Sequence, residues 1–345
     1  MTLQAAFNTQ ALACEGMGSP FMGRLLRMLC AHWPGAGPLH DKLASFEGDI
    51  GPSGHSLPLR VASGLHALVL TNAAPALAAV YPPHEAEDAA LTAAVLEALT
   101  AQESFLRDWI EIPPQTNEVR RSAALIAGAR VAVSHFDLPI ALSELGASGG
   151  LNMMWDHYAI DIDGQRFGPA VPTAVFTPDW VGPPPPDVAP VIAARAGVDL
   201  NPLDPARADH MLRLTAYIWP DQPERLALTR AAGSIVTTPP ERGDAVTWLS
   251  GRLAAAPAGH LHLIQHTVAW QYFPAAAQAH GRVLIEAAGA QATAQRPLAW
   301  LSVEADSTGA RGALIALRLW PGDLRLTLGR SDFHGRWINW SPRIG

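Results

Sequence analysis

The sequence is poor in cysteine and almost devoid of lysine. Its 345 residues include two cysteines, Cys14 and Cys30, whose spacing fits neither a disulfide framework nor a C-x-x-C metal or redox motif. Lys42 is the single lysine, and the 24 basic residues are scattered without a run in a chain of net charge −7. Such a charge distribution argues against a nucleic-acid partner. We therefore expect reduced thiols and no binding of nucleic acid.

Long apolar runs are also missing. No run reaches the ~20 residues that span a bilayer, and the first ten residues lack the basic start and apolar centre of a signal peptide. Apolar residues make up 49% of the chain and charged residues 16%, which is typical of a globular protein with a sizeable core. These features predict a cytoplasmic protein without a membrane partner, and they leave its oligomeric state open.

The first part of the chain, residues 1–134, has the rhythm of helices. Within residues 88–110, apolar residues recur three or four apart, as on one face of a helix that ends before Pro113 and Pro114. This stripe consists of Leu91, Val95, Leu99, Gln102, Leu106 and Trp109. A second apolar stretch contains His66, which we interpret as a packed core histidine. No strand pattern comes before residue 138, so we expect a helical N-terminal domain.

After residue 135 short apolar runs alternate with helical stretches, which predicts an α/β domain over 135–345 with a mostly parallel sheet. The expected strands are 139–146, 191–200, 260–267, 298–304, 313–320 and 324–330, with a weaker one near 235–243. The last two runs are joined by Pro321-Gly322-Asp323, so they must form an antiparallel hairpin. Residues 157–190 leave this scheme. They alternate as a hairpin around Asp163-Gly164 and continue into a proline-rich connector, so we interpret them as an insertion.

The stretch ELGASGGLN, residues 144–152, allows two interpretations. From Gly146 to Gly150 it spells G-x-S-x-G, the nucleophile elbow of serine hydrolases, with Ser148 as the nucleophile. From Glu144 it spells E-x-G-x-S-x-G, an acid followed by small residues that let a ligand approach the backbone of a strand–loop–helix turn. We call residues 146–150 the glycine loop. The dinucleotide fingerprint G-x-G-x-x-G does not fit, which disfavours hydride transfer.

The spacing from Glu144 resembles the first motif of class I S-adenosylmethionine-dependent methyltransferases, E-x-G-x-G-x-G, with Ser148 in place of the middle glycine. In that fold an acid at the end of the second strand binds the ribose hydroxyls, and another after the third strand lies by the adenine. Asp244 is the candidate for the second acid, although it also suits a helix N-cap. For the ribose acid we prefer Asp199, at a strand end, over Asp221, which also fits a capping box.

A second resemblance extends over nearly the whole chain. The segments PPQTNEVRRSAAL, ELGASGGLN, YIWPDQPER, RGDAVTWL, HTVAWQY and HGRWINW are similar to those of a bacterial family, the domain of unknown function 2332 family. The resemblance implies a Rossmann-like class I methyltransferase sheet, mostly parallel with a C-terminal antiparallel hairpin, beside a helical N-terminal region. The cofactor is then S-adenosylmethionine. The implied cofactor-binding residues are Glu144, Gly146, Ser148, Gly150, Asn152, Asp199 and Asp244.

Polar residues ahead of the first expected strand form another candidate site. In PPQTNEVRRS, Gln115 and Asn117 end a loop and open a helix, so both can reach over the glycine loop. Helix capping explains them equally well. We expect a substrate-binding role for Gln115 and a catalytic role for Asn117.

The segment HLHLIQHTVAWQYF offers a catalytic base. His266 lies near the carboxyl end of the expected strand, where it can accept a proton from a methyl acceptor, and Trp270 and Tyr272 can flank the substrate. Packing of these residues under a helix is the competing explanation. His260 lies about 20 Å along the strand from His266, so we do not expect a metal site.

The hydrolase interpretation needs partners for Ser148. Asp306 and His334 follow it in the chain order of the α/β-hydrolase triad. The helical region upstream, Glu144 and the late antiparallel hairpin all argue against it. We therefore predict a protein that transfers the methyl group of S-adenosylmethionine to a small-molecule acceptor, chiefly by holding the two reactants in line. The alternative from another class is a non-catalytic protein of the same fold that binds this cofactor or a nucleotide.

Overall fold

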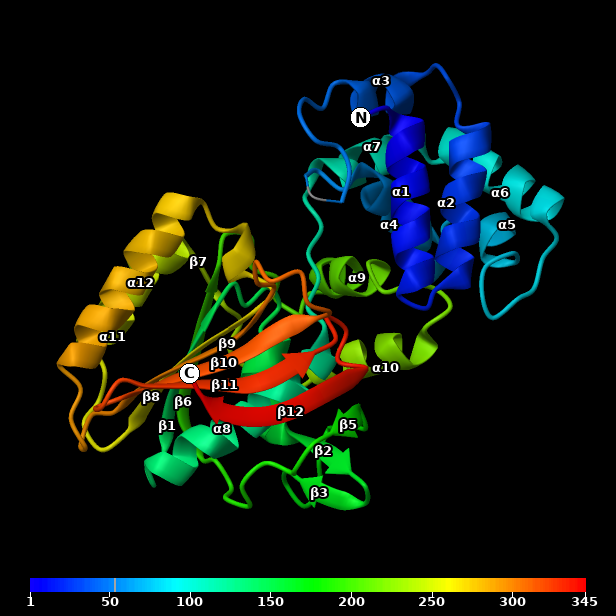
Figure 1. The fold of residues 1–345 in the computed structure, drawn as a ribbon. Coiled ribbons are helices and arrows are strands. Elements are labelled where there is room, and N and C mark those ends of the chain that lie inside the picture. The colour runs from blue at the N-terminus through cyan, green and yellow to red at the C-terminus, as the bar shows by residue number, and fades with distance from the viewer. Residues whose placement is uncertain (53) are drawn as a thin grey trace. The chain divides into compact units, whose positions relative to one another are not determined.

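The computed structural model describes residues 1–52 and 54–345 (Figure 1). The chain forms two compact units. Unit 1 comprises Met1–Thr116 and Ala208–Arg230, and unit 2 comprises Asn117–Arg207 and Ala231–Gly345. This division differs from the boundary expected near residue 134 in two ways. Unit 2 begins earlier, and a later segment of the chain belongs to unit 1.

Unit 1 consists of helices that surround a buried α4. Its helices are α1 (Leu3–Gly16), α2 (Pro20–His32), α3 (Pro38–Ala44), α4 (Leu57–Leu70), α5 (Pro75–Ala78), α6 (Asp88–Ala101), α7 (Glu103–Glu111), α9 (Ala208–Ala216) and the start of α10 (Pro223–Gly233). Every residue of α4 from Arg60 through Leu68 is buried, as expected for a helix without a polar face. His66 is among them. Its Nδ1 lies 3.1 Å from the carbonyl oxygen of Ala216, and burial lowers its pKa to about 4, so the predicted packed histidine is confirmed.

The single helix expected over residues 88–110 is two helices in the structure. Helix α6 ends at Ala101 and α7 begins at Glu103, with Gln102 in a non-helical conformation between them (φ −113°, ψ 24°). The apolar stripe is therefore shared by two elements. Glutamine is a good helix former, so nothing in the local sequence marks this turn.

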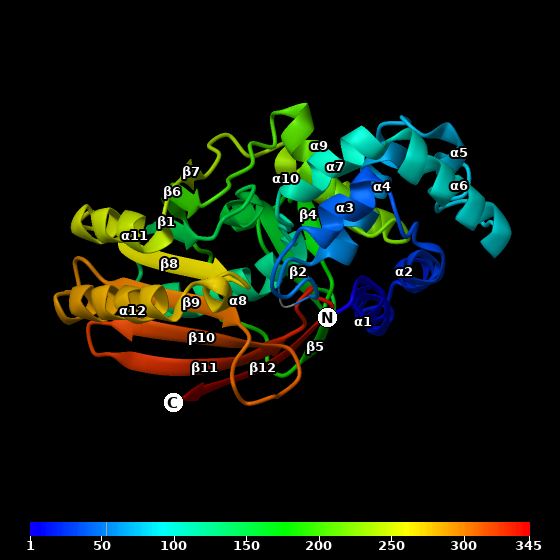
Figure 2. The same cartoon turned by 90° about the horizontal axis from the view of Figure 1, so that it is seen from above.

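Unit 2 is built on a nine-stranded sheet. Its strands are β1 (Ile140–Leu145), β5 (Asp179–Val181), β6 (Ile192–Asp199), β7 (Glu241–Arg242), β8 (Leu261–Thr267), β9 (Leu298–Glu304), β10 (Ala313–Trp320), β11 (Leu324–Ser331) and β12 (Trp337–Ile344). They lie in the order β5-β12-β11-β10-β9-β8-β1-β6-β7 (Figures 1 and 2). Six of the expected strands are confirmed, and the weaker one near 235–243 is reduced to the two residues of β7. Strands β5 and β12 are additions that the sequence did not indicate.

The sheet has a parallel part and an antiparallel part. Strands β7, β6, β1, β8 and β9 are all parallel to their neighbours in this series. From β9 through β12 each pair is antiparallel, and the β10–β11 pair is the hairpin predicted around Pro321-Gly322-Asp323. Numbered along the chain, the parallel strands have the order 3-2-1-4-5 of a doubly wound sheet.

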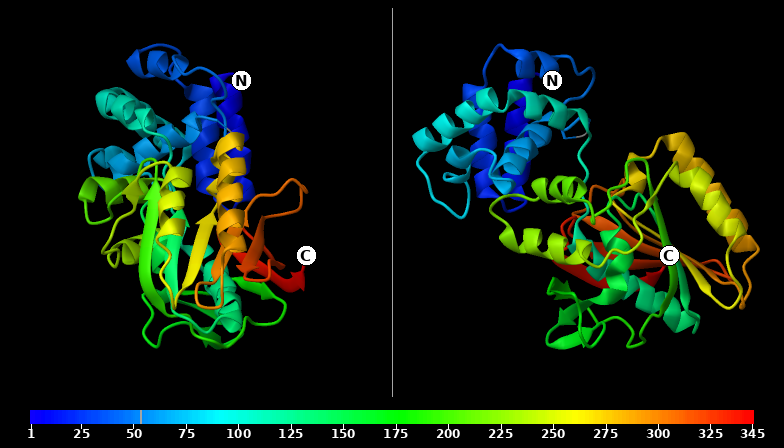
Figure 3. Two further views of the ribbon diagram at one scale, coloured as in Figure 1. Left: turned by 90° about the vertical axis from the view of Figure 1, so that its left-hand side faces the viewer. Right: turned by 180° about the vertical axis from the view of Figure 1, so that it is seen from behind.

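Helices cover both faces of this sheet (Figure 3). Helix α8 (Ser122–His135) packs so closely on β9 that a Cβ added to Gly128 would lie 2.6 Å from Cδ1 of Leu301. The guanidinium of Arg282, from α12 (Ala275–Ala290), lies over the ring of Trp300, the adjacent residue of β9. Successive residues of a strand point to opposite faces, so α8 and α12 lie on opposite sides. Helix α11 (Ala245–Ala254) packs against β1 and β6.

Most of the insertion predicted over 157–190 forms a small sheet of its own, but its strand β5 pairs with β12 in the main sheet. Strands β2 (Tyr158–Ile162), β3 (Gln165–Phe167) and β4 (Ala174–Phe176) have the order β3-β2-β4. The β2–β3 hairpin turns at Asp163 and Gly164, both with positive φ, where the sequence predicted it. Among the described residues, no helix combines the length and the apolar character needed to cross a membrane.

Candidate functional site

The glycine loop follows β1 at the switch point of the parallel sheet. The neighbours of β1 are β6 on one side and β8 on the other, so successive crossovers leave β1 in opposite directions. Crevices for ligands form beyond the carboxyl ends of strands at such a point. Gly146, Ser148 and Gly150 have φ of 69°, 52° and 74°. The small residues thus make a tight turn at the position where the sequence placed the site.

Two side chains hold the glycine loop from outside. The backbone N–H of Ser148 donates to Oδ2 of Asp199 at 2.9 Å, at the end of β6. The N–H groups of Gly149 and Leu151 donate to Oδ1 of Asn117 at 3.2 and 2.9 Å. Asn117 and Asp199 were both singled out in the sequence, and the structure brings them to the loop. The chain's own oxygen atoms therefore occupy these three loop donors.

Glu144 lies in a buried polar cluster beneath the loop. Its Oε2 accepts a hydrogen bond of 3.1 Å from Nε2 of Gln265, the residue opposite it on β8. Oε1 of Gln265 in turn accepts from the indole of Trp155 at 2.9 Å. Burial raises the pKa of Glu144 to about 8, against the opposing effect of Gln265. At neutral pH Glu144 is therefore mostly a neutral acid that can donate as well as accept.

Two polar atoms in this region lack partners within the described part of the chain. They are Oγ of Ser148 and Nδ2 of Asn152, in side chains that are 4% and 1% exposed. Oδ1 of Asn152 accepts from the hydroxyl of Ser122 at 2.8 Å, so the amide nitrogen alone is left over. Buried donors without acceptors are costly. Their presence beside the glycine loop indicates unused binding capacity there.

Gln265 is a site residue that sequence reasoning missed. A signal was present, because Gln265 follows the apolar pair Leu263-Ile264 within an expected strand, and every residue of that strand is buried. Its alignment with Glu144 depends on the register of two strands more than 100 residues apart in the chain. That register could not be obtained from the local pattern.

The loop after β8, residues 268–272, closes against the glycine loop. We call it the β8 loop. A Cβ added to Gly146 would lie 2.5 Å from Cβ of Ala269, so only glycine fits here. Val268 has a φ of 50°, an unfavourable value for a β-branched residue. The carboxylate of Glu304 holds the loop in place, because it accepts from the N–H groups of Ala269 and Trp270 at 3.0 and 3.1 Å.

His266 is bound on both ring nitrogens. Its Nε2 accepts from the indole N–H of Trp300 at 2.9 Å, and because an indole can only donate, Nδ1 carries the proton that faces Glu304 at 2.7 Å. Burial opposes ionisation of Glu304, but the bonds from His266 and the loop amides hold its pKa below the ordinary value. His266 therefore has no free lone pair for a proton from a methyl acceptor. The catalytic role expected for it is not supported by this geometry.

The aromatic residues of the β8 loop differ in their surroundings. Trp270 is 6% exposed and stacks on His266 with ring centroids 5.0 Å apart. It is thus packed inside unit 2, which was the competing explanation for this residue. Tyr272 is 71% exposed. The last residue expected to bind substrate, Gln115, belongs to unit 1, whereas Asn117 belongs to unit 2.

The two remaining acids cap helices. Asp244 is exposed and accepts from the N–H and the hydroxyl of Thr247, so it is the N-cap of α11, and these bonds lower its pKa. Asp221 accepts from Ser19 Oγ at 2.6 Å and from Phe21 N at 3.0 Å, at the start of α2 in unit 1. Of the candidates for the ribose acid, Asp199 is the one bonded to the glycine loop.

The hydrolase and metal alternatives find little geometric support. Ser148 has no hydrogen-bonded base among the described residues, and Asp306 pairs with Arg330 at 2.7 Å. His262 bonds to the hydroxyl of Ser143 at 2.9 Å, and His260 to the carbonyl of Ala258 at 3.0 Å. These contacts engage the histidines separately.

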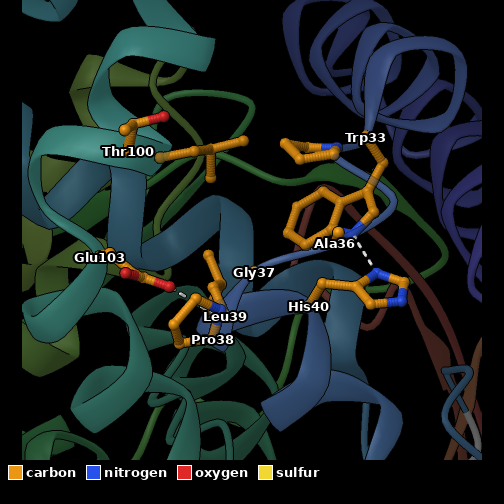
Figure 4. A pocket seen from close by; sticks show the side chains of 10 residues that line it. Trp33, Ala36, Gly37, Pro38, Leu39, His40, Thr100 and Glu103 are labelled. Atoms are coloured by element: carbon orange, nitrogen blue, oxygen red, sulfur yellow. Dashed lines mark hydrogen bonds between the residues drawn. The ribbon is translucent and has the colours of Figure 1, made fainter.

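Unit 1 contains a pocket of about 180 Å³ between α3, α6 and the segment before α3 (Figure 4). Its walls are mainly apolar, and its two ionisable side chains are already engaged. The indole of Trp33 donates to Nδ1 of His40 at 3.2 Å, and Glu103 accepts from the N–H of Leu39 at 2.8 Å. These bonds fix the segment that leads into α3, and we assign no chemistry to the pocket.

Comparison with protein-family models gives a match over residues 4–340. The family is described as "Uncharacterized protein conserved in bacteria (DUF2332)". The chain belongs to this family. Significant similarity is found neither to a curated protein nor to a solved structure. The family resemblance inferred from the sequence segments is thereby confirmed.

Proposed function

We propose that unit 2 binds S-adenosylmethionine at the carboxyl edge of β1 and β6 and transfers its methyl group to a small-molecule acceptor. The observation that carries the proposal is the bond between Ser148 N and Asp199 Oδ2. It joins the loop of the E-x-G-x-S-x-G motif to the acid at the end of the next parallel strand. The 3-2-1-4-5 order of the parallel strands supports the same site.

The residues at this edge suit such a cofactor. Asp199 is partly exposed at the end of β6, the place that the resemblance gives to the acid that binds the ribose. Ser148 Oγ and Asn152 Nδ2 are unused donors in the described structure, and they suit the carboxylate of the amino-acid part. The bound cofactor would supply an electrophilic methyl group. The protein's contribution is then to hold an acceptor in line with that group and to exclude water.

A non-catalytic binding protein of the same fold is the second candidate. It is favoured by the engagement of both nitrogens of His266 and by the bonds of Asn117 to the loop amides. In this case unit 2 retains the cofactor site, and His266 does not act as a base there. Three successive antiparallel strand pairs, from β9 to β12, also extend the sheet beyond the final hairpin that the resemblance implied.

Calorimetric titration with S-adenosylmethionine and S-adenosylhomocysteine tests both candidates. We expect binding by the wild type, loss of most affinity in Asp199→Ala, and unchanged affinity in Asp221→Ala, the matched acid that caps α2. Failure of the wild type to bind either compound would refute both candidates. Binding together with methylation of any acceptor in a small-molecule panel supports the enzyme, and binding without turnover supports the second candidate.

A further inference from the structure

Unit 1 buries two arginines that have no carboxylate partner in the described structure. Arg60 on α4 is 3% exposed, and Arg213 on α9 is 8% exposed. Helix α4 packs against both α9 and α7. The guanidinium of Arg213 also lies over the ring of Trp109, 4.0 Å from its centroid. Two full positive charges are thus brought together inside one helical unit.

The C-terminal end of α7 accounts for part of this arrangement. Arg60 Nη1 donates to the carbonyl oxygens of Ile110 and Glu111 at 2.8 and 3.3 Å. Arg213 donates more weakly to the carbonyl of Trp109, at 3.4 and 3.5 Å. The end of a helix offers about half a negative charge, which does not balance two guanidinium groups. The carboxylate of Glu111 pairs with Lys42.

Several donors of the two arginines are left over. Arg60 Nε donates to the carbonyl of His55 at 2.7 Å, but no acceptor among the described residues bonds to Arg60 Nη2 or Arg213 Nε. Burial lowers the pKa of both groups from the ordinary value for arginine. An arginine nevertheless stays protonated in a protein, so both charges persist.

Tyr217 adds a third unused donor to the cluster. Its side chain is 7% exposed, and its hydroxyl has no hydrogen bond of normal geometry to any described residue. Burial raises the pKa of this phenol, although Ser63, Arg213 and Arg60 lie near enough to oppose that effect. Ser63 is already engaged, because it donates to the carbonyl of Arg60 and accepts from the indole of Trp109. Tyr217 is therefore a neutral O–H donor beside two cations.

We propose that Arg60, Arg213 and Tyr217 form a binding site for an oxyanion, a carboxylate or phosphate group of a ligand of this protein. Buried charges are normally paired, and a buried hydroxyl without a partner, such as that of Tyr217, is costly. Guanidinium groups bind carboxylate and phosphate oxygens through two parallel N–H bonds. An oxyanion supplies the missing negative charge and the acceptors at once. The site lies within unit 1 and is independent of the function proposed for unit 2.

Thermal unfolding of the full chain in different anions tests this site. Sodium phosphate and sodium acetate are titrated against sodium chloride at constant ionic strength. We expect a saturable rise of several degrees in the unfolding temperature with at least one oxyanion, and none with chloride. Phosphate and acetate are separate arms, so the result also identifies which group fits. Equal unfolding temperatures in all three salts would overturn the proposal.

Two conservative variants locate the effect, each compared with its own unfolding temperature in chloride. Tyr217→Phe removes a single hydroxyl and should raise the half-saturating anion concentration about tenfold, the usual effect of losing one hydrogen bond to a charged group. Arg213→Lys keeps the charge but loses the paired donors, and it should weaken binding at least as much. Arg107→Lys, exposed on α7, is the matched control and should bind as the wild type does. Undiminished anion stabilisation in both buried variants would place the anion elsewhere and refute the site.

Discussion

The raised pKa of Glu144 predicts that stability falls as pH rises. Burial raises the pKa of this carboxyl from 4.5 to about 8 in the folded protein. Between these two values the folded state binds more protons than the unfolded state, so the free energy of unfolding decreases by about 1.4 kcal/mol per pH unit. The loss begins near pH 4.5 and is complete above pH 8, where it amounts to about 5 kcal/mol. Glu144→Gln removes this dependence, because an amide does not ionise and its oxygen can still accept from Gln265.

Urea unfolding of the wild type and Glu144→Gln at each pH from 5 to 9 measures this effect. The quantity of interest is the difference in unfolding free energy between the two proteins, since all other titrating groups cancel. We expect this difference to change steadily in favour of the variant and to level off above pH 8. Glu241→Gln, an exposed carboxyl on β7, is the control and should show a constant difference. A constant difference for Glu144→Gln as well would refute the buried carboxyl and its effect.

Three further predictions concern the loops and the caps. Gly146→Ala should destabilise unit 2 by about 1–3 kcal/mol in thermal unfolding, because the new Cβ strains a positive φ and presses on the β8 loop. The control Gly251→Ala, in the open interior of α11, should instead stabilise unit 2 by roughly 0.5–1 kcal/mol. Glu304→Gln should raise the hydrogen-exchange rates of the β8-loop amides bonded to it and leave those of α11 unchanged. Equal rates for the β8-loop amides in the variant and the wild type would show that Glu304 does not hold this loop. Asp221→Ala should cost about 1–2 kcal/mol, because Ser19 Oγ and Phe21 N at the start of α2 lose their acceptor, although Ser19 remains the N-cap of the helix. No change in urea unfolding would contradict that role.

Much of the sheet could be predicted from local patterns. Strands β1 and β8 are rich in leucine and isoleucine, and the β10–β11 hairpin is marked by its proline and glycine. Strand β12 was not predicted because apolar and polar residues are mixed in it, Pro342 lies within it, and its last residues are exposed. The boundary of unit 1 was predicted wrongly for a different reason. Helix α8 has the same helical rhythm as its predecessors, and only its packing on β9 assigns it to unit 2.

The candidate site was predicted in part. Asp199 and Asn117 could be named, because strand ends and loop-to-helix transitions have local signatures. The state of His266 could not be predicted, since it depends on Glu304 and Trp300, more than 30 residues away and on a neighbouring strand. A histidine near a strand end has the same sequence pattern whether it is free or bound at both nitrogens. Side-chain partners of this kind are fixed by tertiary packing alone.

The return of residues 208–230 to unit 1 has a consequence for synthesis on the ribosome. Unit 1 cannot be completed when residue 116 emerges, because two of its residues are made later. Asp221 accepts a bond at the start of α2, and Trp219 is part of the core of unit 1. At typical elongation rates the delay is on the order of 10 seconds, during which the first segment of unit 2 is also exposed. Unit 1 is then finished while β7 and all later strands are still unmade. A nascent chain stalled shortly after residue 230 would thus carry one finished unit and a β1 that has its partner β6 on one edge but lacks β8 on the other.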